Sequence, residues 1–237
     1  MIDRRSTQIH SQILRVEKIF EELAIAYKRD LENKSISDEA LVLTHEVVEK
    51  CANILDQTMT LVFETKILPK LSEPPKRGGY FPAAKNEDSY LSGMGQWKVK
   101  DLGAIDADLD AALRSLQPFS AKENEIYARI RDLASKKHTA LEPQVRREQP
   151  IVTTVGHSGN SVVRWNPNNV TFGAGVRISG VPVNPHTQMP IEDPQLSIRR
   201  EVWVSFHLAG TGEDAYRLCY DAVNATKRAV KLLLESK

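Results

Sequence analysis

The side chains best suited to chemistry lie in one predicted helix near the middle of the chain: Arg131, Asp132 and His138. With about 100° of turn per residue, Arg131 and His138 differ by about 20° around a helix and by about 10.5 Å along its axis, so they share a face. An imidazole titrates near neutral pH and can act as a general acid or base, while a guanidinium can hold a phosphate. Such a pair can cleave RNA without a metal. In that hypothesis Asp132 orients the other two groups.

The same residues also have a structural interpretation. Side chains lean toward the N-terminus of a helix, so Arg131 points away from His138, and a phosphate shared by both requires a dimer. In the alternative, Arg131 forms surface ion pairs and His138 packs near the end of the helix, where the helix dipole favours a cation.

The spacing resembles the Arg-polar-x(4–6)-His motif of HEPN-domain ribonucleases, which are helical bundles that pair their motifs across a dimer. A wider pattern is similar to a set of uncharacterised bacterial helical-bundle proteins with no known activity. It comprises Leu116-Gln117-Pro118-Phe119 and Lys137-His138, and this likeness covers roughly residues 40 to 142. The HEPN motif usually opens the last helix of its bundle, whereas here predicted strands follow it.

A second candidate site is one face of the predicted sheet. It carries Trp203 and His207 on the last strand, with Arg164 or Trp165 on a neighbouring strand. Exposed aromatic rings among arginines can stack single-stranded bases or contact a partner. In the alternative, a Pro-rich loop at 181–197 covers this face and buries the tryptophans.

Composition limits the classes of function. The 237 residues carry a net charge of +1, with 41% hydrophobic and 27% charged residues, which is typical of a globular protein and not of a polycation. The two cysteines, Cys51 and Cys219, are far apart in sequence and predict free thiols in a reducing compartment. We expect a cytoplasmic protein with no membrane span, no secretory signal, no cofactor and no metal site.

Helical periodicity dominates the first part of the chain. Apolar residues step by three and four over 9–31 and again over 41–62, which predicts an antiparallel hairpin whose second helix Ser37 caps and Pro69 ends. The second helix has a wide apolar face and is therefore expected to be central. A long loop follows over 71–90, which we expect Tyr80 and Phe81 to drape over the bundle.

Two further helices are predicted over 102–116 and 126–141, stopped by Pro118 and Pro143.

From Pro150 the apolar period changes to two. The pattern predicts an antiparallel meander with strands at 151–155, 161–165, 170–178 and 198–208. Thr211 is then expected to cap a final helix that returns to the bundle or covers the sheet.

The sequence therefore predicts an α+β protein, with a helical bundle over 1–149 and a meander plus C-terminal helix over 150–237. The favoured function is a non-catalytic interaction or regulatory module, whose partner is an unknown protein or a second copy of the chain. The alternative is a HEPN-like endoribonuclease that uses Arg131 and His138 at a homodimer interface, with RNA as substrate. A small-molecule sensor with a pocket between sheet and bundle is a third hypothesis.

Overall fold

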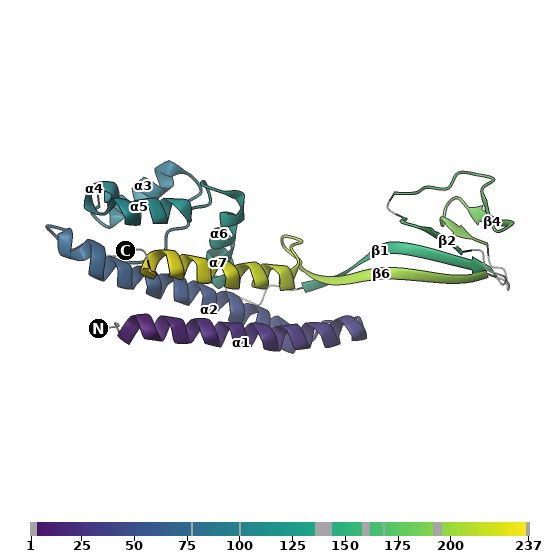
Figure 1. Ribbon diagram of the computed structural model, residues 1–237, viewed down its shortest axis with the longest axis horizontal. Coiled ribbons are helices and arrows are strands. Elements are labelled where there is room, and N and C mark those ends of the chain that lie inside the picture. Colours follow the sequence, from purple (N-terminus) through teal and green to yellow (C-terminus); the bar gives the residue numbers. More distant parts are fainter. Residues whose placement is uncertain are drawn as a thin grey trace. The chain divides into compact units, whose positions relative to one another are not determined.

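A computed structural model describes residues 4–76, 78–99, 101–135, 144–157, 162–167, 169–191 and 196–235 (Figure 1). The predicted α+β class is confirmed. Contacts divide the chain into a helical unit, Met1–Val145 with Phe206–Lys237, and a strand unit, Arg146–Ser205. The predicted boundary after residue 149 grouped the last helix with the strands, whereas the structure groups it with the other helices.

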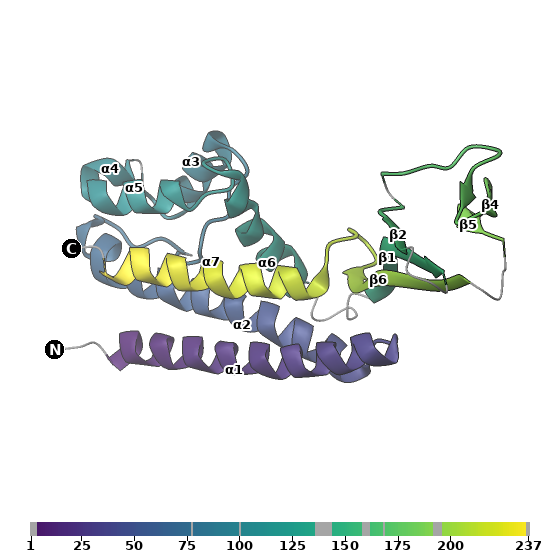
Figure 2. The same cartoon turned by 45° about the vertical axis from the view of Figure 1, so that its right-hand side comes forward.

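The helical unit contains, in chain order, α1 (Arg4–Asn33), α2 (Asp38–Val62), η1 (Phe63–Ile67), η2 (Leu68–Lys70), α3 (Glu87–Gln96), α4 (Leu102–Ile105), α5 (Ala107–Ser115), η3 (Lys122–Asn124), α6 (Glu125–Ser135) and α7 (Ala215–Glu235). In Figures 1 and 2, α1, α2 and α7 run side by side, and α3, α4 and α5 lie on the far side of α7 from α1.

The predicted hairpin of α1 and α2 is confirmed. Val16 and Leu23 of the α1 stripe are fully buried, because the apolar face of this helix packs against α2 and α7. Ser37 caps α2, as predicted, by accepting a hydrogen bond from the backbone N–H of Ala40. The carboxylate of Asp30, which is 2% exposed, accepts bonds from the N–H and the hydroxyl of Ser37, both at 2.8 Å. These bonds close the turn between the two helices.

The central place predicted for α2 is also confirmed. It packs against α1, α6 and α7, and Val47, Cys51 and Ile54 are fully buried. Its helical backbone continues through the π-helix η1 and the 3₁₀ helix η2, so it ends at Lys70, one residue beyond the predicted stop at Pro69.

The loop after η2 lies close against α2. A Cβ on Gly79, whose φ is +84°, would stand 2.9 Å from the Cα of Thr60, so glycine permits this approach. Phe81 is buried, as expected, whereas Tyr80 is 57% exposed and does not anchor the loop. The loop predicted over 71–90 ends earlier than expected, because Asn86 caps α3, which begins at Glu87.

The helix predicted over 102–116 is broken into α4 and α5. Asp106 has extended backbone angles and its side chain caps α5 by accepting a bond from the N–H of Leu109, at 3.0 Å. The side chain of an aspartate competes with the helix for backbone N–H groups, and here it interrupts the helix. The apolar spacing continues on both sides of Asp106 and therefore does not reveal the break.

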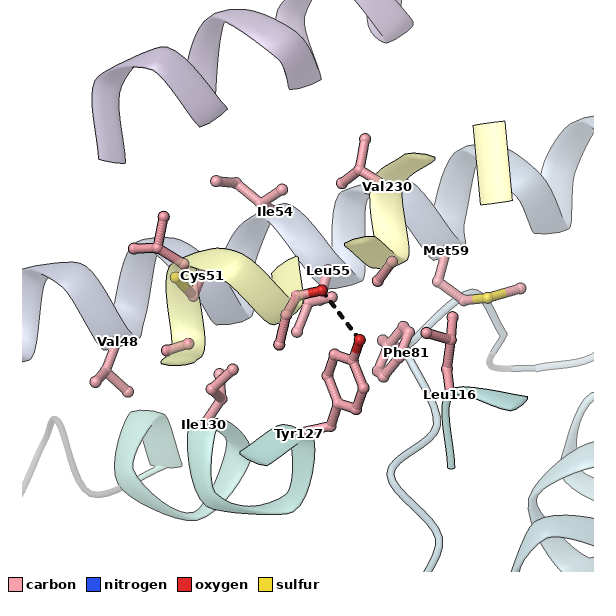
Figure 3. Packing of buried hydrophobic residues seen from close by; sticks show 14 of the residues in the cluster. Val48, Cys51, Ile54, Leu55, Met59, Phe81, Leu116, Tyr127, Ile130 and Val230 are labelled. Atoms are coloured by element: carbon pink, nitrogen blue, oxygen red, sulfur yellow. Dashed lines mark hydrogen bonds between the residues drawn. The ribbon is translucent and has the colours of Figure 1, made fainter. Parts of the chain in front are cut away.

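The last helix returns to the bundle and packs against α2, which is one of the two predicted outcomes. Thr211 does not cap it. The cap is Asp214, whose Oδ1 accepts a bond of 2.7 Å from the N–H of Arg217. Figure 3 shows the resulting core, in which side chains of α2, α6 and α7 meet, among them Cys51, Ile130 and Val230.

The strand unit is built from β1 (Gln144–His157), β2 (Val162–Trp165), β3 (Arg177–Ile178), β4 (Val181–Asn184), β5 (Met189–Pro190) and β6 (Leu196–Leu208), the ends of β1 and β6 reaching into the helical unit. One sheet has the order β2-β1-β6 and the other β3-β4-β5, and β1 pairs antiparallel with β2. The strand predicted over 170–178 is limited to its last two residues. The Pro-rich segment predicted as a loop contains β4 and β5.

Candidate functional site

Arg131 lies on α6, and its guanidinium contacts groups of the same chain. Its Nη1 lies 3.4 Å from Oδ1 of Asp56 on α2 and also donates to the carbonyl oxygen of Phe81. The side chains of Arg131 and Asp56 are 37% and 32% exposed. Burial raises the pKa of Asp56, and the charge of Arg131 partly opposes this shift. Arg131 therefore ties α6 to α2 and to the preceding loop.

Asp132 is exposed and accepts a hydrogen bond of 3.0 Å from Arg129, one turn earlier on α6. Arg129 also donates to Glu213 at 2.6 Å and to Thr211 at 3.1 Å, so it links α6 to the segment before α7. His138 lies outside the described residues. The predicted arrangement of Arg131, Asp132 and His138 therefore stays a prediction.

The prediction that Trp165 offers an exposed ring for stacking is wrong. Trp165 is 7% exposed and belongs to the core of the strand unit with Val155, Ile178 and Val183. Its ring meets that of Phe172 edge-on, with 5.1 Å between centroids. Val183 of the 181–197 segment belongs to this core, so for Trp165 the segment contributes to burial as the alternative expected, together with Phe172 and Ile178.

The other predicted residues of the sheet face fall in different parts of the structure. Arg164 is exposed on β2, and the side chain of Trp203 lies outside the described residues. His207 belongs to the helical unit, where its Nδ1 bonds to the carbonyl oxygen of Gly212 and its backbone bridges to Asp214. A stacking surface shared by Arg164, Trp203 and His207 therefore stays a prediction.

A groove of about 1300 Å³ lies between α6 and α7 in the helical unit. Its lining comprises Ala83, Lys85, Pro118, Lys122, Glu123, Glu125, Ile126, Ala128, Arg129, Arg131, Asp132, Glu213, Asp214, Arg217, Leu218, Asp221, Asn224, Ala225 and Arg228. These include six basic and six acidic side chains, so the formal charge of the lining is zero.

Three residues connect the two walls of this groove. Tyr127 of α6 is fully buried and its hydroxyl donates a bond of 3.0 Å to the carbonyl oxygen of Ala225 on α7, the dashed line in Figure 3. Burial raises the pKa of the Tyr127 phenol, so it remains a hydrogen-bond donor at neutral pH. Arg228 of α7 donates to Oδ1 of Asn124 at 2.6 Å and to the Tyr127 hydroxyl at 3.4 Å.

Sequence reasoning missed this trio. In the helix predicted over 126–141, the apolar spacing predicts that Ile126, Ile130, Leu133 and Ala140 or Leu141 face inward. The buried positions of α6 among the described residues are instead Tyr127, Ile130 and Leu133. Tyr127, Ile130 and Leu133 are three residues apart, and this helical spacing could have placed Tyr127 on the buried face. Nothing in the local sequence signals that Asn124 meets Arg228, because 104 positions separate them.

Among the described residues, no group of three or more His, Cys, Asp or Glu side chains is placed to hold a metal ion. Within the same residues, no helix combines the length and apolar character that crossing a membrane requires. Comparison with models of known protein families, with curated proteins and with solved structures found no match.

Proposed function

We infer that this chain is a non-catalytic interaction module and that a partner binds in the groove between α6 and α7. The observation that carries this proposal is the size and lining of the groove. Pockets for small molecules measure about 300–1,000 Å³, so the groove is large for a single small ligand. A segment of polypeptide is a better match to its volume.

The charge of the lining also favours a polypeptide over a nucleic acid. A phosphate backbone is held by an excess of lysine and arginine, because each contact neutralises a phosphate. Here six carboxylates offset the six cations. A lining with charges of both signs suits a partner that carries both positive and negative charges, or only a few charges, better than a uniformly negative one.

Several groove side chains already serve the fold. Arg129, Arg131 and Arg217 each pair with a carboxylate of the same chain. The lining also contains partly or fully buried apolar groups, including Ala128 and Leu218. Protein interfaces likewise combine apolar and polar groups.

A library of random dodecapeptides displayed on phage tests the proposal. Peptides selected on the wild-type protein should bind much more weakly to Ala128→Trp, because the indole ring occupies the groove. Ala134→Trp is the matched control, since Ala134 lies on the same helix with intermediate exposure but does not line the groove. Equal binding to both variants, or no selected peptide at all, would refute the proposal.

The alternative function is a metal-independent endoribonuclease. Arg131 and Asp132 both line the open groove, which is the observation in its favour. The endoribonuclease alternative requires a dimeric protein. It also requires that the protein cleaves RNA in the presence of EDTA and that His138→Ala abolishes this cleavage. The interaction module instead predicts intact RNA at high enzyme excess, since the Arg131 guanidinium is already bound to Asp56 and to a backbone carbonyl.

A further inference from the structure

Arg228 on the α7 wall of the groove is built as a receptor for an anionic group. We propose that the groove takes an acidic polypeptide segment and that Arg228 binds one of its carboxylates. This inference rests on the proposed function, because it names the chemistry of the partner that the groove binds.

The guanidinium of Arg228 is held in place from one side. Its Nη2 donates to Asn124 and to Tyr127, and its central carbon lies 5.8 Å from the centroid of the Tyr127 ring. Both bonds use the same nitrogen. In the part of the chain that the structure describes, Nε and Nη1 make no hydrogen bond, so either nitrogen can donate to an oxygen of a carboxylate.

Asn124 fixes this orientation. Its side-chain nitrogen donates to the carbonyl oxygens of Ser115 at 2.8 Å and Gln117 at 3.0 Å. The residue is 1% exposed, so its amide cannot turn without leaving both carbonyls unpaired. Oδ1 must therefore face Arg228. A guanidinium positioned before binding loses less side-chain entropy when a ligand arrives.

Arg228 differs from the other three arginines of the groove, which pair with carboxylates, because it has no ion pair among the described residues. Two lysines that line the groove, Lys85 and Lys122, also have no ion pair there, and the same holds for three lining carboxylates, Glu123, Glu125 and Asp214. The preference for an anion is therefore local to Arg228, whose positive charge no carboxylate of the described residues offsets within ion-pair distance.

The tightest peptide from the library serves as the probe for this inference. Fluorescence anisotropy would measure its affinity for the wild-type protein, and each Glu or Asp of the peptide would be replaced in turn by Gln or Asn. We expect at least one such replacement to weaken binding about tenfold, the effect of losing one charge-assisted hydrogen bond of about 1.4 kcal/mol.

Substitutions in the protein locate the contact. Arg228→Gln should weaken the acidic peptide about tenfold and should abolish the difference between that peptide and its neutral version, since the two changes remove one contact. Lys231→Gln is the matched control, because Lys231 is an exposed cation of α7 outside the groove. Should Arg228→Gln unfold, Arg228→Lys and the peptide substitutions still decide the question.

The outcomes separate this inference from the function it rests on. Selected peptides that bind in the groove but tolerate loss of every acidic residue overturn the acidic partner and leave the proposed function standing. Displacement of the peptide by millimolar inorganic phosphate, but not by sodium chloride of equal ionic strength, would make Arg228 a small-anion site only. A library that yields no groove-dependent peptide overturns both.

Discussion

Replacing Asn124 by aspartate tests whether this residue orients the groove, because the two side chains have the same shape. The change turns the donor that faces Ser115 and Gln117 into an oxygen. Two hydrogen bonds are lost, worth about 2 kcal/mol net, and two carbonyl oxygens then face an anion. A stronger bond to Arg228 offsets part of this loss. We expect the free energy of unfolding to fall by about 2 kcal/mol, and Tm by roughly 4–8 °C.

Urea denaturation followed by far-UV circular dichroism is the appropriate assay, since the α-helices lie in the helical unit. Asn224→Asp is the matched control, as Asn224 is an exposed residue of α7 and its change should cost less than about 0.5 kcal/mol. If Asn124→Asp is as mild as this control, Asn124 does not hold the two carbonyls and the preorganisation of Arg228 fails with it.

Tyr127→Phe should lower the free energy of unfolding by about 1 kcal/mol in urea denaturation, because it removes the hydroxyl that bonds to Ala225; an unchanged midpoint would contradict this bond. Burial raises the pKa of Asp56 in the folded protein, so folding disfavours ionisation of this carboxyl group. The contribution of Asp56 to stability therefore falls as the pH rises from its pKa in the unfolded chain to its pKa in the folded protein. The stability advantage of the wild type over Asp56→Asn should therefore be smaller at neutral than at acidic pH, and the opposite trend in urea titrations would refute the sign. Trp165→Ala should destabilise the strand unit by about 3 kcal/mol, seen as faster hydrogen exchange of its strand amides, and unaltered exchange would argue against a buried ring.

The sequence was a good guide wherever a regular period coincided with burial. The stripes of α1 and α2 predicted two packed helices because residues three and four apart share a face that only a neighbouring helix can bury. Ser37 was predictable as a cap since serine satisfies an otherwise unpaired N–H. The small residues Ala222 and Ala229 of α7 are fully buried, which allows a close helix contact, and α7 packs against α2.

Local signals failed where two residue types compete for the same role. Thr211 and Asp214 can both cap a helix, and the structure uses Asp214 because the Thr211 hydroxyl accepts a bond from Arg129 instead. The helix α3 was missed because its segment contains Gly93 and Gly95, which weaken helix propensity. It forms because Asn86 caps it and the side chains of Tyr90 and Met94 are buried.

The groove itself could not be predicted from the sequence. Its walls come from segments about ninety positions apart, and contacts such as that between Asn124 and Arg228 leave no periodic trace. Arg131 was singled out by its spacing to His138, but the spacing carried no information on Asp56, which lies on another helix and binds the guanidinium.

Methyl NMR of the protein with the tightest library peptide tests most directly whether the groove is the binding site. If the peptide binds in the groove, the methyl shifts of Ile126 and Leu218, on the two walls, should change most and saturate with peptide concentration. The methyl shifts of the strand unit, such as those of Ile178 and Val183, should not change. Shift changes that concentrate on the strand unit and spare both groove walls would contradict binding in the groove.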